Sequence, residues 1–172
     1  EIIESPIEEL VGAHAVIWTT TPWTIPVNQA LAYGPEVDYV HIAELDEMAE
    51  ETGRRFVVAR ELYEAFRERI RSQADPQQNY ATVDFYLGSE LAGTKVRHPI
   101  HHLGGFYATP RPMLPGDFVT TDSGTGIVHM SPDHGEDDFE LCKAHGINPV
   151  FAVQNDGTYR DDWLWLGGDD ER

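Results

Sequence analysis

Short apolar runs, rich in β-branched and aromatic residues and ended by Gly, Pro or Asp, limit the possible folds of this sequence most strongly. Such runs are typical of strands, and none approaches the length of about 20 residues needed to span a membrane. The description fits segments 13–20, 30–33, 39–43, 55–59, 80–87, 118–121, 126–130 and 149–153. Strands therefore outnumber helices, which indicates an α+β domain around a small sheet that is closed or strongly bent.

Two segments have the pattern of helices. Segment 60–72 has an apolar residue at every fourth position, which forms one stripe toward the core: Leu62, Phe66 and Ile70. Segment 135–145 has acidic residues in its first turn, basic residues in its last turn and Gly146 after it, as the helix dipole and glycine termination favour. The polar segment 73–79 and segment 103–116, with its Gly and Pro residues, are expected to be loops.

The length of 172 residues fits a single domain, residues 1–172, with a substantial core. The chain starts at Glu1 without an initiator Met or a secretory leader, so we expect it to be an excised part of a larger protein. Its single cysteine, Cys142, excludes an internal disulfide framework and fits a reducing compartment. We expect a soluble cytoplasmic protein with no membrane partner, and a monomer.

The charge of the chain is strongly negative. Lys and Arg number 12 against 30 Asp and Glu, which gives a formal net charge of -18, the opposite of a free-standing nucleic-acid binder. Six of the basic residues lie between Arg54 and Arg71, where they form either a solvated helix face, the favoured interpretation, or a local contact for a phosphate backbone. Any nucleic-acid partner must therefore be held mainly by other parts of the protein.

A hydroxyl-rich stretch, residues 19–28, follows the first apolar run and reads Thr-Thr-Thr-Pro-Trp-Thr-Ile-Pro-Val-Asn. Strand alternation sends Thr19 and Thr21 to one face and Thr20 to the other, and the two prolines remove amide donors and bend the chain. Such a turn offers donors and acceptors to a small polar ligand. The alternative is an ordinary strand end in which Trp23 fills the core.

A second segment, residues 122–139, reads as a strand between a turn and the start of a helix. Two glycines in 124–126 are a weak phosphate-loop signal, and a turn leading into the strand is the preferred interpretation. His129 ends that strand, and Asp138 falls in the first helical turn on the same face as Leu141. If that face packs inward, Asp138 points inward as well.

An inward Asp138 requires a partner, because burying a carboxylate costs several kcal/mol unless a cation or hydrogen-bond donors meet it. The ammonium group of a substrate would serve. The alternative is an acid that is favoured only by the dipole at the helix N-terminus.

Side chains that could ligate a metal form two groups: His129, Asp133, His134 and Asp138, and His98, His101 and His102. Neither has a familiar zinc spacing, and one cysteine cannot build a structural site, so we expect no metal. A Ser-His-Asp hydrolase is disfavoured because no Gly-x-Ser-x-Gly motif occurs. Ser123 and Ser131 are interpreted as turn residues and Cys142 as a core residue.

The two segments, in this order and about a hundred residues apart, resemble the editing (CP1) insert of class I aminoacyl-tRNA synthetases for branched aliphatic amino acids. Members specific for valine or leucine typically have Thr-Arg-Pro followed by an acid and Thr. Here Thr21-Pro22-Trp23-Thr24 follows the isoleucyl type, and segment 88–99 reads like its middle part. The likeness is weakest across 44–80. Asp133 departs from the pattern, since relatives usually have Gly there.

The resemblance implies a β-barrel-centred editing domain with a few peripheral helices. Its activity would be the hydrolysis of valyl-tRNA(Ile), with valyl-adenylate as a candidate second substrate, without a cofactor. Its partners would be the aminoacylated 3′ end of tRNA(Ile) and the remainder of the synthetase chain. Neither His-Ile-Gly-His nor Lys-Met-Ser-Lys-Ser occurs, so this chain is not expected to activate amino acids with ATP.

The resemblance also implies roles for single residues. Asp138 would hold the α-ammonium group of the misattached valine, and His129 would line the side-chain pocket and exclude isoleucine. Asn28 would add a polar contact. The opposite, catalytic wall would consist of Thr19, Thr20, Thr21 and Trp23. Two alternatives stay open: a binding module that has lost hydrolysis, which Asp133 makes conceivable, and a metal-dependent hydrolase that uses His129, His134 and Asp138.

Overall fold

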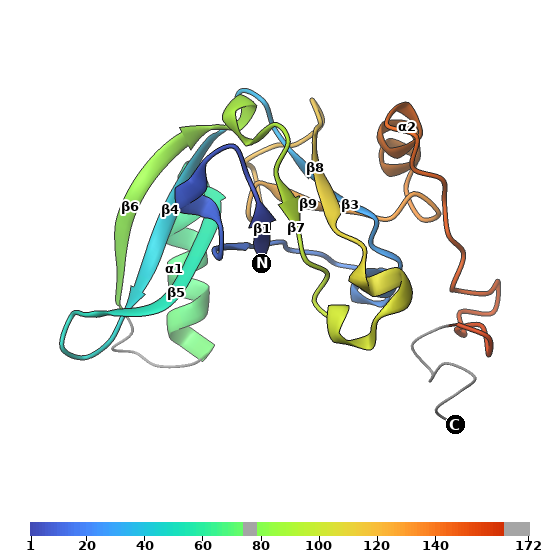
Figure 1. The fold of residues 1–172 in the computed structure, drawn as a ribbon, viewed down its shortest axis with the longest axis horizontal. Coiled ribbons are helices and arrows are strands. Elements are labelled where there is room, and N and C mark those ends of the chain that lie inside the picture. The colour runs from blue at the N-terminus through green and yellow to red at the C-terminus, as the bar shows by residue number, and fades with distance from the viewer. Residues whose placement is uncertain (74–78, 164–172) are drawn as a thin grey trace.

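Two mixed sheets make up the protein, which is seen here in a computed structural model that describes residues 1–73 and 79–163 (Figure 1). The larger sheet has the order β1(Ile2–Glu4), β7(Lys95–Val96), β8(Arg111–Pro115), β3(Ala30–Tyr33) and β9(Ile127–Met130). The smaller has the order β2(His14–Ala15), β5(Glu51–Ala59), β4(Asp38–Leu45) and β6(Asn79–Leu87). Within the described residues, the strand pairings form two sheets rather than one continuous ring.

Strand β3 organises the larger sheet, because it pairs parallel with β8 and antiparallel with β9. All four of its residues are buried, since both faces of the sheet are covered. Leu31 belongs to the core cluster on one face, whereas Ala30 and Ala32 belong to the cluster on the other, which includes Cys142 of the second helix. Because His129 pairs with Leu31, its side chain points to the face of Leu31, away from that helix.

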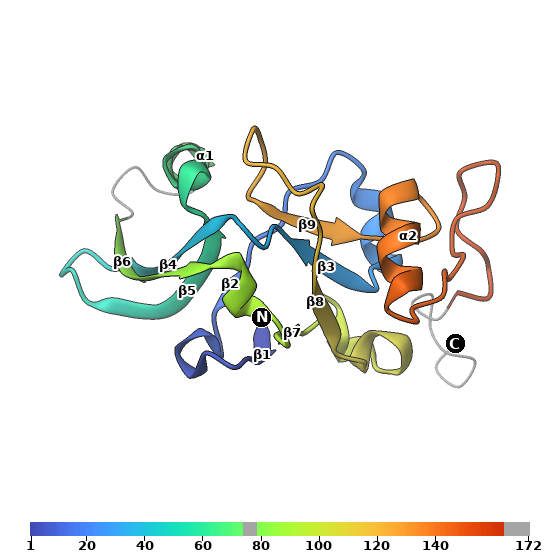
Figure 2. The ribbon, with the colours of Figure 1, turned by 90° about the horizontal axis from the view of Figure 1, so that it is seen from above.

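Two α-helices cover the sheets at opposite ends of the molecule (Figure 2). Helix α1(Tyr63–Gln73) packs on the smaller sheet through Phe66, and α2(Glu136–Ala144) packs on the larger one through Cys142. The remaining helical segments are short 3-10 turns: η1(Glu8–Leu10), η2(Pro22–Val27), η3(Arg60–Leu62), η4(Gly88–Leu91), η5(His101–Leu103) and η6(Gly105–Ala108). None of the described helices is long and apolar enough to cross a bilayer.

The two sheets meet where the end of β5 approaches the turn before β9. The Ala59 N–H donates to the Thr125 carbonyl oxygen at 2.8 Å, and the Tyr39 hydroxyl donates to the Gly126 carbonyl oxygen at 2.6 Å. Gly126 has φ +74°, and a Cβ there would lie 2.3 Å from the Cβ of Ala59. Only glycine therefore fits this junction, and the interpretation of 124–126 as a turn leading into a strand is confirmed.

Most of the predicted elements are present, and the α+β class is confirmed. Strand 30–33 has the predicted bounds, and the strands predicted at 39–43, 55–59, 80–87 and 126–130 differ only at their ends. Helix 135–145 is confirmed, and the helix predicted at 60–72 begins with the 3-10 turn η3. Most of the predicted loop 73–79 lies outside the described residues.

Four predictions were wrong. Only His14–Ala15 of segment 13–20 is a strand, and segment 118–121 is a turn in which the Val119 N–H donates to the Gly116 carbonyl oxygen. Segment 149–153 contributes only the isolated bridge of Val153 to Tyr159.

The fourth wrong prediction is the loop 103–116, which contains the central strand β8. The Gly and Pro residues of this segment suggested a loop, but the two prolines inside the strand, Pro112 and Pro115, lie where the pairing begins or ends. On the side of β3, the pairing begins only after Pro112, with the pair of Leu31 and Met113. On the side of β7, Pro115 lies past the end of that two-residue strand and has no strand residue opposite it. Their missing N–H groups therefore cost no ladder hydrogen bond.

An unpartnered histidine lies in the middle of the smaller sheet. His41 is fully buried, and neither of its ring nitrogens has a hydrogen-bond partner among the described residues. Burial lowers the pKa of His41 below 6.5, and Arg55 lowers it further, whereas Asp84, Glu51 and Glu9 oppose the shift. The side chain is thus neutral at pH 7, and its burial costs stability because no hydrogen bond compensates the lost water.

We predict that His41→Leu stabilises the protein at pH 7 by about 1–3 kcal/mol, because it removes two unsatisfied polar atoms at nearly constant volume. The folded-state pKa is lowered, so the wild-type protein binds fewer protons than its unfolded chain below about pH 6.5 and loses stability as pH falls through that range. The advantage of the variant should therefore grow on acidification. Urea unfolding at pH 7 and 5.5 measures both effects.

The matched control is His102→Leu, since His102 is an exposed histidine. It should leave the pH dependence of unfolding as in the wild-type protein. An equal loss of stability with falling pH in the His41→Leu variant and the wild-type protein would contradict the assignment.

Candidate functional site

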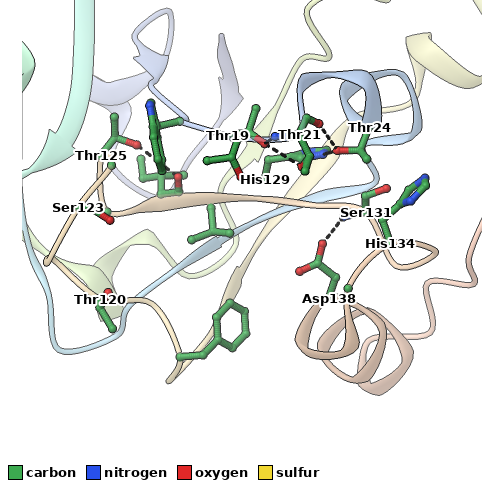
Figure 3. A pocket seen from close by; sticks show the side chains of 18 residues that line it. Thr19, Thr21, Thr24, Thr120, Ser123, Thr125, His129, Ser131, His134 and Asp138 are labelled. Carbon is green, nitrogen blue, oxygen red and sulfur yellow. Dashed lines mark hydrogen bonds between the residues drawn. The ribbon is translucent and has the colours of Figure 1, made fainter. Parts of the chain in front are cut away.

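A cavity of about 380 Å³ lies between the loop that follows β2 and the segment that runs from the turn before β9 to the first turn of α2 (Figure 3). The residues that line it on these two sides include Trp18, Thr19, Thr20, Thr21, Thr24, His129, Ser131, His134 and Asp138. The structure therefore brings together the two segments that the sequence singled out, although they are about a hundred residues apart.

The threonine wall is held by hydrogen bonds within its own loop. The Thr21 N–H donates to the Thr19 hydroxyl at 3.0 Å, and the two hydroxyl oxygens lie 3.2 Å apart. Pro22 then begins the 3-10 turn η2, at a position where a missing N–H costs nothing. The Thr24 hydroxyl closes the loop by donating to the Thr21 carbonyl oxygen at 2.8 Å. The loop thus presents hydroxyl groups to the cavity from a fixed backbone.

His129 is held at both ring nitrogens. The Asn28 Nδ2 donates to His129 Nδ1 at 2.7 Å and also to the Ala30 carbonyl oxygen at 2.8 Å, so the amide nitrogen is the donor in both bonds. Because Nδ1 accepts, the ring proton lies on Nε2, which is 2.9 Å from the Thr24 hydroxyl oxygen and donates to it. The side chain is buried, with 7% of its surface exposed.

His129 is also neutral. Burial lowers its pKa to about 4, and the nearby His98 and His134 contribute in the same direction. At pH 7 the ring therefore carries no charge, and both its nitrogens are engaged within the protein. His129 can form a rigid wall, but it is not free to accept a proton from a water molecule as a general base.

A second, small cavity of about 70 Å³ lies behind His129. Its lining is mainly apolar and includes Ala15, Ile17, Ile25, Leu31 and Val96. His129 lines both this space and the larger cavity, so its ring separates the two. Removing the ring would join the small apolar space to the candidate site.

Asp138 supplies a carboxylate at one end of the cavity, and the turn before β9, with Ser123 and Thr125, lies at the other end (Figure 3). Its Oδ2 accepts the Ser131 N–H at 2.7 Å, and a Cβ at Gly135 would come within 3.2 Å of its Oδ1. Burial raises the pKa of Asp138, the Ser131 hydrogen bond opposes this, and Asp137 and Asp133 raise it further. No Lys or Arg of the described part of the chain forms an ion pair with it, so the carboxylate suits a cationic ligand group.

Asp133, the residue that departs from the family pattern, is turned away from the cavity. Its carboxylate accepts the Ser131 hydroxyl at 2.8 Å and lies 3.1 Å from His134 Nε2, with only 2% of the side chain exposed. Asp133 does not line the cavity, so its charge is taken up by its neighbours.

Two of the residues expected in the site lie elsewhere. The Trp23 side chain is 52% exposed and does not line the cavity, and its carbonyl oxygen accepts the Tyr159 hydroxyl. Asn28 lies behind His129 and contacts its ring. Sequence reasoning assigned no role to Trp18 or Thr24, although both stand in the quoted stretch. Their contacts with residues about a hundred positions away, such as Thr24 with His129, leave no local signal.

The metal-binding alternatives gain no support from the geometry. Within residues 1–73 and 79–163, no group of three His, Cys, Asp or Glu side chains converges. His98 contacts the Ile25 carbonyl oxygen through Nε2 and accepts the Ile100 N–H at Nδ1, so it too serves the local structure. Cys142 lies on the inner face of α2 and is a core residue, as predicted. Burial raises the pKa of its thiol to about 11.

Comparison with known proteins gives close relatives over nearly the whole chain. No family model matches. The chain is 53% identical over 169 residues to the isoleucine–tRNA ligase of Zymomonas mobilis, covering 98% of this chain and 17% of that protein. It is 45% identical over 159 residues to the isoleucine–tRNA ligase of Gluconobacter oxydans, covering 90% of this chain and 16% of that protein. The chain thus spans about a sixth of the length of these relatives.

Solved structures of the same fold include the editing domain of the P. knowlesi cytosolic leucyl-tRNA synthetase, with a TM-score of 0.62, 13% identity, and coverage of 84% of this chain and 61% of that chain. GlLeuRS-CP1 matches with a TM-score of 0.61, 17% identity, and coverage of 85% and 59%. The chain is therefore homologous over nearly its whole length to one segment of the isoleucine–tRNA ligases, and its fold is that of the leucyl-tRNA synthetase editing domains.

Proposed function

We propose that the cavity is a proofreading site that hydrolyses valine wrongly attached to tRNA(Ile). The observation that carries this proposal is the union, in one cavity, of an unpaired carboxylate at Asp138 and a hydrogen-bonded, neutral wall at His129. A carboxylate suits the α-ammonium group that every aminoacyl ester carries. A fixed wall suits the discrimination of two amino acids that differ only in size.

Such a site is needed because valine is one methylene smaller than isoleucine. A hydrophobic pocket discriminates against a missing methylene by only about 1–3 kcal/mol, a magnitude known from isoleucyl-tRNA synthetase itself. A second cavity can instead exclude the larger side chain by steric collision. In this protein the ring of His129 would meet the extra methylene of isoleucine, because Asn28 and Thr24 prevent the ring from turning aside.

In the proposed reaction, water attacks the ester carbonyl carbon and the bond to the ribose oxygen breaks, releasing valine and tRNA with a free hydroxyl. Asp138 binds the ammonium group and so fixes the ester relative to the threonine wall. The hydroxyl and amide groups of Thr19, Thr20 and Thr21 orient the ester and the water. His129 cannot act as the base, so positioning and electrostatic stabilisation account for most of the rate.

Thr24 and Asn28 act in this proposal as positioning residues, since each forms a hydrogen bond with the ring of His129. We leave Trp23 out of the wall, because its side chain lies outside the cavity. The alternative of a binding module without hydrolysis depended on the charge of Asp133, which Ser131 and His134 take up. Because the chain has a net charge of -18, the remainder of the synthetase would hold the tRNA.

We predict that Asp138→Asn in the full synthetase lowers kcat/KM for deacylation of valyl-tRNA(Ile) by roughly tenfold to a hundredfold, because a neutral amide forms a weaker bond to the ammonium group. Aminoacylation with isoleucine should be unchanged. Asp137→Asn, on the exposed side of the same helical turn, is the matched control. Deacylation at the wild-type rate in the Asp138→Asn variant would remove Asp138 from the site.

The pH dependence of deacylation gives an independent test. Only ionised Asp138 binds an ammonium group, and burial raises its pKa, so activity should fall on acidification sooner than an exposed aspartate would cause. Because the pKa of His129 is lowered to about 4, no step should appear near 6.5. A kcat/KM profile between about pH 4.5 and 8 shows both features. A step near 6.5 that disappears in a His129 variant would contradict the neutral wall.

We predict that His129→Ala makes the site attack correctly charged isoleucyl-tRNA(Ile), because the candidate site then extends into the small apolar cavity behind the ring. The ratio of kcat/KM for the valyl and isoleucyl esters should fall by roughly tenfold or more. His134→Ala is the control, since His134 lines the larger cavity without separating it from the small one. An unchanged ratio in His129→Ala would refute the size gate.

A further inference from the structure

A buried arginine lies at the start of β8, the middle strand of the larger sheet. Arg111, the first residue of β8, is only 4% exposed. Its Nη2 donates to the Phe106 carbonyl oxygen at 2.8 Å, and its guanidinium lies 4.3 Å from the centre of the Phe106 ring. Its Nε is buried and has no hydrogen-bond partner within the described residues. One N–H of the guanidinium, that of Nε, therefore lacks an acceptor.

No carboxylate compensates this charge. Arg111 forms no ion pair in the part of the chain that the structure describes. Burial lowers its pKa to about 10, so the guanidinium is still charged at neutral pH. Charged side chains are rarely buried to this extent unless they are paired, since an unpaired buried charge is strongly unfavourable. Among the described residues, Arg111 thus has a carbonyl acceptor and an aromatic ring as partners but no anionic group.

Arg111 lines a cavity of about 330 Å³ that shares no residue with the candidate proofreading site. A second unsatisfied atom lies in the same lining: the Gln29 amide nitrogen donates to the Asn148 carbonyl oxygen at 2.8 Å, but its buried Oε1 accepts no hydrogen bond. Much of the remaining lining is apolar and includes Pro110, Pro112, Leu114 and Ile147. The cavity thus has largely apolar walls and two polar lining residues, each with one buried atom that lacks a partner among the described residues.

This combination fits a polypeptide better than a nucleic acid. A phosphate group has acceptors for Arg111 but no donor for Gln29 Oε1, so a nucleotide would need a second group such as its 2′-hydroxyl, whereas a short peptide segment with an acidic side chain supplies both. Apolar walls with prolines also suit side chains rather than a sugar-phosphate backbone. The relatives are about six times as long as this chain. This chain also covers only 59% and 61% of the two solved chains, which therefore extend beyond the matched part. Ample polypeptide therefore exists outside residues 1–172.

We propose that the cavity around Arg111 is the docking site for a segment of the synthetase polypeptide outside these 172 residues. This segment presents an Asp or Glu carboxylate to the Arg111 guanidinium and an N–H group to Gln29 Oε1. The contact anchors the editing domain to the rest of the synthetase at the start of β8. It is independent of the hydrolytic activity proposed for the other cavity.

Hydrogen exchange of the full-length, tRNA-free synthetase tests this proposal. Arg111→Met removes the charge, and Gln29→Met removes the acceptor on the opposite side of the cavity. Both variants should accelerate exchange, roughly tenfold or more, in one and the same segment outside residues 1–172. Arg111→Lys, which keeps the charge but not the forked geometry, should have a smaller effect on that segment. Arg97→Met is the control, because Arg97 is exposed and pairs with Glu1.

Acceleration confined to residues 1–172 in the Arg111 and Gln29 variants would overturn the proposal, since it shows that no outside segment docks. Acceleration that appears only when tRNA is bound would assign the cavity to a phosphate instead. If Arg111→Met fails to fold, Arg111→Lys and Gln29→Met still decide, because they must affect the same outside segment. Unchanged deacylation of valyl-tRNA(Ile) in these variants separates this contact from the proposed proofreading function.

Discussion

The hydrogen bonds of His129 to Thr24 and Asn28 join two parts of the chain that are about a hundred residues apart. They fix the ring position, its tautomer and, through burial, its neutral state. Without them the threonine loop and strand β9 would share a cavity but no defined wall. The size of the candidate site therefore depends on the hydrogen bonds that hold the His129 ring.

The scaffold makes this constraint possible. Strand β3 places Leu31 beside His129, and the residues just before it position Asn28 against the same ring. Gly126 allows the smaller sheet to meet the turn before β9, so the strand that carries His129 is fixed at both ends. On its other side, α2 brings Asp138 to the Ser131 N–H. One short central strand thus supports both walls of the cavity.

The sequence predicted the elements whose signals are local. The apolar periodicity of the first helix, the charge pattern and terminal glycine of the second, and the strands 30–33 and 126–130 were all recognised. Strand β8 was missed because its prolines suppress the local signal, and its pairing with β3 is visible only in three dimensions. The same reason hid Thr24 and misplaced Trp23, since a side chain's role in a cavity depends on residues far along the chain.

Charge connects the proposed site with the rest of the domain. A net charge of -18 repels the phosphates of tRNA, but it favours the ammonium group at the reacting end of an aminoacyl ester. The uncompensated carboxylate of Asp138 adds to this preference at close range. A domain of this kind would recognise the misattached amino acid and leave the nucleic acid to other parts of the synthetase. Because the proposed editing cavity would then contribute little to tRNA affinity, the other parts of the synthetase would have to set the position of the bound 3′ end relative to this cavity.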